Sequence, residues 1–150
     1  MTVAPTVHAS AVLAGARAVL IRGPAGAGKS RLALALIQAA ETGPLRFARL
    51  VGDDRVHLEA CHERLLVRPA ASLAGLIEVR GVGIARLDHE PVAVVGLVVD
   101  LAAGDAERLP AEPETEVCGV RLRRLAVTAG TDPLPAVLAV LLRLPPATPD

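Results

Sequence analysis

One stretch decides the fold: Val19-Leu20-Ile21-Arg22-Gly23-Pro24-Ala25-Gly26-Ala27-Gly28-Lys29-Ser30, continued by Arg31-Leu32-Ala33-Leu34-Ala35-Leu36. An apolar segment, a glycine-rich turn and an Ala/Leu segment predict a strand, a tight turn and a helix. The spacing from Gly23 to Ser30 is G-x-x-x-x-G-K-S, the phosphate-binding P-loop pattern. In such a turn the backbone N–H groups and the start of the helix attract a phosphate. We therefore predict a nucleotide phosphate site formed by Gly23, Pro24, Ala25, Gly26, Ala27, Gly28, Lys29 and Ser30.

The basic residues of the chain support this interpretation. Of the 16 lysine and arginine residues, Lys29 is the only lysine. A compact ammonium group suits a phosphate cradle better than a planar guanidinium fork does. Lys29 can reach the β- and γ-phosphates of a nucleotide, and the Ser30 hydroxyl can ligate Mg²⁺.

Composition limits the other functions. The chain of 150 residues is predicted to be one domain, with a core over about residues 6–144 and a proline-containing tail over 145–150. One Phe, no Trp or Tyr and a net charge of zero argue against nucleic acid and anionic membranes as partners. Neither a signal peptide nor a run of 18 apolar residues is evident, and Cys61 and Cys118 lack metal-ligand spacing. We therefore expect a cytoplasmic protein.

Two adjacent carboxylates follow the next predicted strand. Residues 48–52 have the composition of a short strand, and Asp53-Asp54 come directly after it. Functional groups of α/β proteins gather at the carboxyl ends of strands, near the loop that follows the first strand. Such a pair can hold a metal-bound water and act as a base. The alternative is a solvated turn, because Asp favours turns.

A second unusual segment covers residues 73–84. Glu78 and Arg80 alternate with apolar residues, which predicts that they share one face of a short strand. They could form an ion pair on an edge strand. Alternatively, Glu78 could face a metal ion while Arg80 faces a phosphate or a partner. The residue pattern leaves both open.

The remaining segments predict the other elements. Thr131-Asp132-Pro133 is typical of a helix start, with Asp132 as the N-cap and Pro133 in the first turn. The complete prediction is a hairpin over 6–22 with His8 on its first strand, a helix over 29–41, strands over 48–52, 56–59 and 65–68, a buried central strand over 91–101, a loop over 103–116, a strand over 120–127 and a helix from 133 to about 144.

The order of these motifs resembles a known family. Val7-His8-Ala9-Ser10, the P-loop, Leu50-Val51-Gly52-Asp53-Asp54 and Leu76-Ile77-Glu78-Val79-Arg80-Gly81-Val82-Gly83 together resemble the catalytic domain of HPr kinase/phosphorylase, which modifies a serine of the phosphocarrier protein HPr. The likeness covers roughly residues 6–144 and is to the short, alphaproteobacterial form. It implies an α/β P-loop kinase core with a mixed, antiparallel-rich sheet, similar to the nucleotide-binding part of phosphoenolpyruvate carboxykinase.

The resemblance also implies roles for single residues. ATP would lie on the P-loop, with Mg²⁺ held by Ser30, Asp53 and Glu78. Asp54 would be the general base that takes the proton of the substrate serine. His8 would lie near the phosphates, Arg108 would stabilise the transferring phosphoryl group, and Arg80 would support the signature segment and the reverse reaction.

The implied partner is an HPr-like phosphocarrier of a regulatory phosphotransferase system. In the reverse reaction inorganic phosphate attacks the phosphoserine and pyrophosphate leaves; whether the short form retains it is open. Because family members are often hexamers, we expect a homo-oligomer.

Two other functions stay open at this stage. A small-molecule P-loop kinase would need an arginine-rich lid, for which Arg121, Arg123 and Arg124 are the candidates. A regulatory module could instead sense ATP without transferring phosphate, although such a module has no use for the Asp53-Asp54 pair.

Overall fold

A computed structural model of the chain describes residues 5–106 and 113–142. In chain order its elements are β1 (Thr6–His8), β2 (Ser10–Ala14), β3 (Arg17–Arg22), α1 (Lys29–Thr42), β4 (Ala48–Gly52), β5 (Arg55–Cys61), β6 (Arg64–Pro69), a 3₁₀ turn (Ala71–Leu73), β7 (Leu76–Val79), β8 (Gly83–Arg86), β9 (Ala93–Asp100), β10 (Glu114–Val117), β11 (Val120–Ala126) and α2 (Leu134–Leu141).

The predicted strand, turn and helix around the P-loop pattern are confirmed. β3 ends at Arg22 and α1 begins at Lys29, with the glycine-rich turn between them. The helix ends where Gly43 adopts a left-handed conformation (φ 112°) and donates its N–H to the Ala39 carbonyl at 3.1 Å.

The apolar strand predicted over 91–101 lies at the centre of the sheet as β9. β3 pairs with one edge of β9 in parallel register, and β11 pairs in parallel with the other edge. β6 pairs antiparallel with the first residues of β9, on the same edge as β11. The strand order is β1-β5-β6-β9-β3-β2-β4. Outside this order, β11 pairs with β9 and with β10. The predicted mixed, antiparallel-rich sheet is therefore confirmed.

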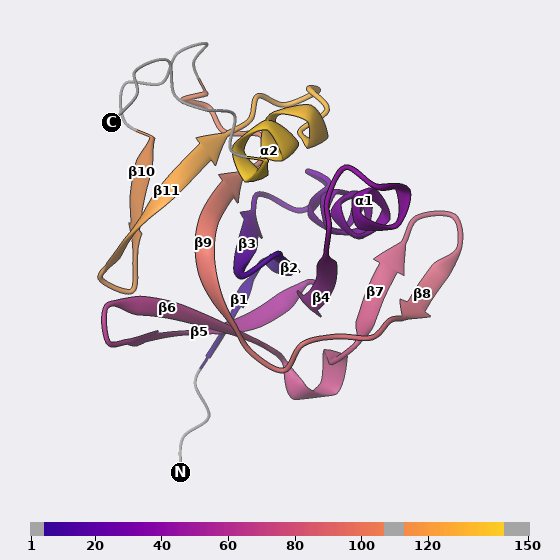
Figure 1. Cartoon of the computed structure of the whole chain (residues 1–150), viewed down its shortest axis with the longest axis horizontal. Helices are drawn as coiled ribbons and strands as arrows, with labels where there is room; N and C mark the ends of the chain where they lie inside the picture. The colour runs from indigo at the N-terminus through magenta and orange to yellow at the C-terminus, as the bar shows by residue number, and fades with distance from the viewer. Residues whose placement is uncertain (1–4, 107–112, 143–150) are drawn as a thin grey trace.

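An apolar cluster lies on each face of the sheet. α1 and α2 cover one face (Figure 1), where Leu32 and Leu36 of α1 belong to the same cluster as Val19 and Ile21 of β3. On the other side the hairpins β5–β6 and β10–β11 extend away from α1. Alternate side chains of one strand thus enter different cores, which explains why β3 and β9 are apolar on both faces. No helix in the described part of the chain is long and apolar enough to cross a membrane.

The first predicted strand is divided in the structure. β2 forms the expected hairpin with β3, but β1 pairs with β5, so that His8 lies opposite Arg55. The break falls at Ala9, whose N–H binds the Asp54 carbonyl at 3.2 Å. The hairpin prediction was therefore wrong for residues 6–8, because alternation along a segment does not reveal a change of partner strand.

Three further predictions need correction. β7 ends at Val79, so Arg80 lies in the turn before β8 and shares no strand face with Glu78. Residues 114–117, predicted as the end of a loop, form β10, which turns into β11 through two positive-φ residues, Cys118 and Gly119. The N-cap of α2 is Pro133, although Asp132 still accepts the Leu134 N–H at 3.1 Å.

The packing of α1 on the sheet gives a stability prediction. Leu36 is fully buried between the helix and the sheet. Leu36→Ala should lower the free energy of unfolding by about 3 kcal/mol, because the lost apolar contacts are accompanied by a cavity. Urea denaturation followed by circular dichroism measures this loss. Val82→Ala is the control, since Val82 is 79% exposed; an equal loss in both variants would contradict this account of the core.

Candidate active site

The P-loop leaves β3 and closes over the start of α1. Gly23 allows a close approach to β9, since a Cβ there would make a tight contact of 3.1 Å with the Leu101 carbonyl oxygen. Gly26 and Gly28 have φ values of 82° and 99°, which side chains disfavour. The Lys29 ammonium donates to the carbonyls of Gly23 at 2.8 Å and Pro24 at 3.3 Å. Lys29 is therefore held within the loop, where a phosphate oxygen could replace these two acceptors.

Asp53 lies beside the first turn of α1. The residue is only 3% exposed. The Ser30 hydroxyl donates to the carboxylate and lies 2.8 Å from both oxygens, and the Ser10 hydroxyl donates to Oδ1 at 2.6 Å. The Glu78 N–H donates to Oδ2 at 3.2 Å. The structure thus brings together three of the predicted residues, but Glu78 contributes its backbone while its side chain is exposed.

Ser30 and Asp53 supply hard oxygen donors that suit Mg²⁺. Mg²⁺ is commonly bound by one or two carboxylates together with phosphate oxygens and water. Among residues 5–106 and 113–142, no group of three or more His, Cys, Asp or Glu side chains could hold a metal ion. One carboxylate and one hydroxyl would fit a magnesium ion whose other ligands are phosphate oxygens and water.

Asp54 occupies a different environment from its neighbour. Its side chain is 67% exposed, and its backbone is left-handed, with φ 69°. Its Oδ1 lies 3.9 Å from His8 Nδ1. Arg55 can only donate and lies 2.9 Å from His8 Nε2, so Nε2 is the acceptor and the neutral ring carries its proton on Nδ1, toward Asp54.

The remaining predicted residues do not join this group. Arg80 is exposed in the turn between β7 and β8. Arg108 lies outside the described residues.

Sequence reasoning missed a second charged cluster at the ends of three parallel strands. Arg22, the last residue of β3, donates to Asp100 of β9 at 2.7 and 2.9 Å. Arg124 of β11 donates to Asp100 at 2.6 Å and to both oxygens of Asp105 at 2.8 and 2.9 Å. Arg124, a candidate lid residue in the sequence, is thus engaged by two carboxylates. The only signal in the sequence was that two apolar strands end in residues of opposite charge, Arg22 and Asp100.

These contacts shift the pKa values of the cluster. Burial raises the pKa of Asp100, but hydrogen bonds from Arg22 and Arg124, together with their charges, outweigh burial and hold that pKa below its ordinary value. Hydrogen bonds from Arg124 also lower the pKa of Asp105. In turn, the bonds to Asp105 and Asp100 raise the pKa of Arg124. All three groups therefore stay charged at neutral pH.

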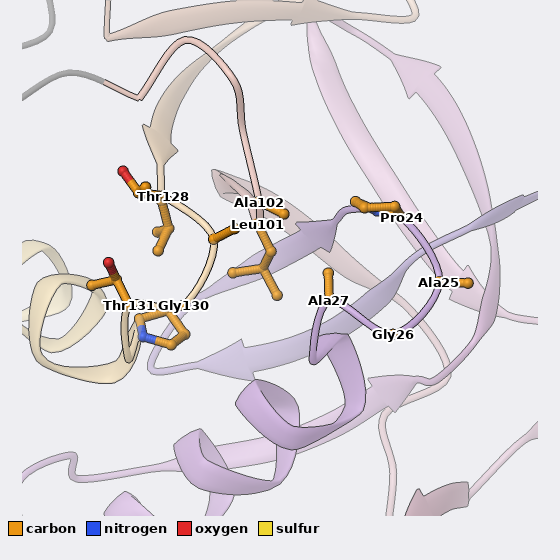
Figure 2. A pocket seen from close by; sticks show the side chains of 12 residues that line it. Pro24, Ala25, Gly26, Ala27, Leu101, Ala102, Thr128, Gly130 and Thr131 are labelled. Carbon is orange, nitrogen blue, oxygen red and sulfur yellow. The ribbon is translucent and has the colours of Figure 1, made fainter.

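A pocket of about 310 Å³ lies between the loops that follow the strands of this cluster. The loops that follow β3, β9 and β11 line it. The ion pairs of the charged cluster therefore connect the three strands from which these loops extend. Figure 2 shows the P-loop facing the other two loops across the pocket. The lining is Pro24, Ala25, Gly26, Ala27, Leu101, Ala102, Val127, Thr128, Ala129, Gly130, Thr131 and Pro133.

The charged cluster predicts a pH-dependent stability. Asp100→Asn should lower the free energy of unfolding by about 2 kcal/mol at pH 7, because Arg22 and Arg124 lose a charged acceptor. The folded-state pKa of Asp100 is depressed, so its contribution is present above the unfolded pKa of about 4 and is lost as pH falls through the folded value. Urea denaturation of both proteins from pH 7 to pH 3 should show the difference shrinking below about pH 4.

Asp88→Asn provides the control, because Asp88 is exposed on the loop after β8. It should change stability by less than about 0.5 kcal/mol at each pH. A difference between wild type and Asp100→Asn that stays constant over the whole range would contradict the assigned role.

Known proteins of one family resemble this chain in sequence and in fold. Residues 1–90 match the family model of the HPr Serine kinase C-terminal domain. HPr kinase/phosphorylase of Limosilactobacillus reuteri (strain DSM 20016) is 33% identical over 131 residues, which cover 87% of this chain and 37% of that protein. HPr kinase/phosphorylase of Streptococcus thermophilus (strain CNRZ 1066) is 48% identical over 67 residues, 44% of this chain and 19% of that protein.

A solved structure has the same fold over nearly the whole chain. The Hpr(Ser) kinase/phosphatase from Coxiella burnetii superposes with a TM-score of 0.72 at 26% identity, covering 93% of this chain and 94% of that chain. The match to the Limosilactobacillus protein, by contrast, spans 37% of its length. The resemblance found in the sequence is confirmed: the chain belongs to the HPr serine kinase C-terminal domain family.

Proposed function

We propose that this protein is an ATP-dependent serine kinase that phosphorylates an HPr-like phosphocarrier protein in the cytoplasm. One observation carries the proposal: two adjacent carboxylates differ in environment beside a P-loop. Asp53 is buried against Ser30, whereas Asp54 is exposed and faces His8. The first suits binding of a metal–nucleotide complex and the second suits proton transfer with a protein substrate.

The residues of the P-loop would bind the phosphates of ATP. Its backbone N–H groups and the Lys29 ammonium would hold the β- and γ-phosphates, while the base and ribose would have room in the pocket of about 310 Å³. Ser30 and Asp53 would hold Mg²⁺, which when bound supplies positive charge against the phosphate oxygens. The chain aligns the reactants mainly through these contacts.

Asp54 would act as the general base. As the serine oxygen forms a bond to the γ-phosphorus, the bond from that phosphorus to the bridging oxygen of ADP breaks. The hydroxyl proton passes to the Asp54 carboxylate, and ADP leaves. The His8 Nδ1–H, 3.9 Å from Asp54 Oδ1, would help orient that carboxylate.

Other expectations from the resemblance remain proposals. Glu78 would contribute to metal binding, Arg80 to the signature segment and Arg108 to charge stabilisation. The names of the relatives include phosphorylase and phosphatase, which supports testing phosphorolysis of the phosphorylated carrier with inorganic phosphate. Light scattering after size exclusion would test the proposed homo-oligomer.

The kinase proposal makes a direct prediction. Purified protein with Mg²⁺, γ-labelled ATP and the HPr-like protein of the same organism should place label on a serine of that carrier, located by mass spectrometry. Asp54→Asn should lower the transfer rate by about 10²-fold or more while ATP still binds, because only the proton acceptor is lost. Lys29→Ala should lose ATP binding as well, since its ammonium contacts phosphate.

Two variants serve as controls. Asp88→Asn matches the charge change of Asp54→Asn at an exposed loop position, and Arg31→Ala removes an exposed cation two residues after Lys29. Both should transfer label at the wild-type rate. Tight ATP binding by the wild type with no label on the carrier would overturn the proposal and favour a small-molecule kinase or an ATP sensor.

A further inference from the structure

Ser10 is a buried polar side chain that the proposed mechanism has not used. It begins β2, is 0% exposed, and is one of two buried polar or charged residues in the described part of the chain, the other being Asp53. The two side chains contact each other: Ser10 Oγ lies 2.6 Å from Asp53 Oδ1. A polar pair at this depth needs an explanation, because a buried hydroxyl is tolerated only where it is bonded.

The directions of the hydrogen bonds follow from the chemistry of the groups. An ionised carboxylate only accepts, so Ser10 donates its one proton to Asp53. The lone pairs of the same oxygen then accept the Asp54 N–H, 3.4 Å away. One hydroxyl group therefore bridges the side chain of the buried carboxylate and the backbone of the exposed one.

The Asp54 backbone is bound from two sides by the break between β1 and β2. Its N–H contacts Ser10, and its carbonyl accepts the Ala9 N–H at 3.2 Å. These two contacts help to hold Asp54 in a left-handed conformation, φ 69°, which Asp tolerates better than most side chains but which remains less favoured than the right-handed one. Loss of the Ser10 contact would leave a strained residue held through its carbonyl alone.

Ser10 also becomes more important when Ser30 is engaged elsewhere. In the structure Ser30 and Ser10 both donate to Asp53. If Ser30 turns its oxygen to a metal–nucleotide complex, the Ser10 hydroxyl and the Glu78 N–H are the two donors left to orient that carboxylate.

We propose that Ser10 is a positioning residue for phosphoryl transfer, which orients the metal-binding carboxylate of Asp53 and holds the backbone of the candidate base Asp54. The inference rests on the proposed kinase function. Ser10 touches no reacting atom; it acts through two residues that do. Groups that orient a metal ligand typically change metal affinity or activity by about 10- to 100-fold when they are removed.

Three substitutions distinguish the effect of the Ser10 hydroxyl group from the effect of the side-chain volume. Ser10→Ala removes the hydrogen bonds, Ser10→Cys keeps a similar volume with a weak donor, and Ser10→Thr keeps the hydroxyl. Ser72→Ala is the matched control, because Ser72 is exposed in the 3₁₀ turn. Urea denaturation of every variant at the assay temperature shows which of them are folded, so that activity is compared only between folded proteins.

Two readouts are measured on the full chain. The first is kcat and KM for ATP with the carrier protein. The second is the affinity for Mn²⁺ in the presence of a non-hydrolysable ATP analogue, followed by electron paramagnetic resonance. Ser10→Ala should lower kcat by about 10- to 100-fold with KM for ATP within about 3-fold, and should weaken Mn²⁺ binding by about 10-fold. Ser10→Cys should resemble Ala, Ser10→Thr should recover most of the loss, and Ser72→Ala should match the wild type.

The inference and the proposed function can fail separately. Wild-type protein that transfers no label contradicts the kinase function, while the Mn²⁺ affinity still decides whether Ser10 orients Asp53. Folded Ser10→Ala with wild-type kcat and Mn²⁺ affinity would overturn the inference. So would folded Thr and Ala variants with equal losses, because the effect would then come from packing and not from the hydroxyl.

Discussion

The buried carboxylate of Asp53 sets the condition that the rest of the site must meet. A charge at 3% exposure is stable only when its oxygens are bonded. The donors come from three elements: Ser10 from β2, Ser30 from α1 and the Glu78 N–H from β7. The start of the helix and the β7–β8 hairpin are therefore fixed against the end of β4. The hydrogen bonds that stabilise the Asp53 charge therefore also hold the parts of the site together.

A second constraint arises from the parallel strands. β3, β9 and β11 run parallel and finish at the same end of the sheet, so Arg22, Asp100 and Arg124 come together. Asp105, in the loop after β9, supplies the second carboxylate that balances the two arginines. Because the charges pair at the strand ends, the loops beyond them are free to form a pocket without charged lining. Asp53 thus organises the region around Ser10, Ser30 and β7, while Asp100 organises the strand ends that carry the loops of the pocket.

Local patterns in the sequence were sufficient for the glycine-rich turn after β3, for α1 and for β4, which ends at Gly52 just before Asp53, because each depends on adjacent residues. Features that depend on pairing were not accessible. The change of partner at Ala9 places His8 beside Arg55 and Ser10 against Asp53, and nothing in residues 6–14 indicates it. Likewise, the bond between Arg124 and Asp100 follows from the register of β11 on β9. β10 was missed because the segment is acidic, although its glutamates alternate with Thr115 and Val117.

The two hairpins β5–β6 and β10–β11, which lie on the same edge of β9, have their turns far from the candidate site. β5 starts after Asp54 and ends at Cys61, about 20 Å farther along an extended strand, and Cys118 forms the turn at the opposite end of β11 from the pocket. Both thiols are exposed. The chain therefore carries a natural pair of attachment points for spin or fluorescent labels, one on each hairpin. A distance measured between them, with and without ATP, would report whether the two hairpins move relative to each other.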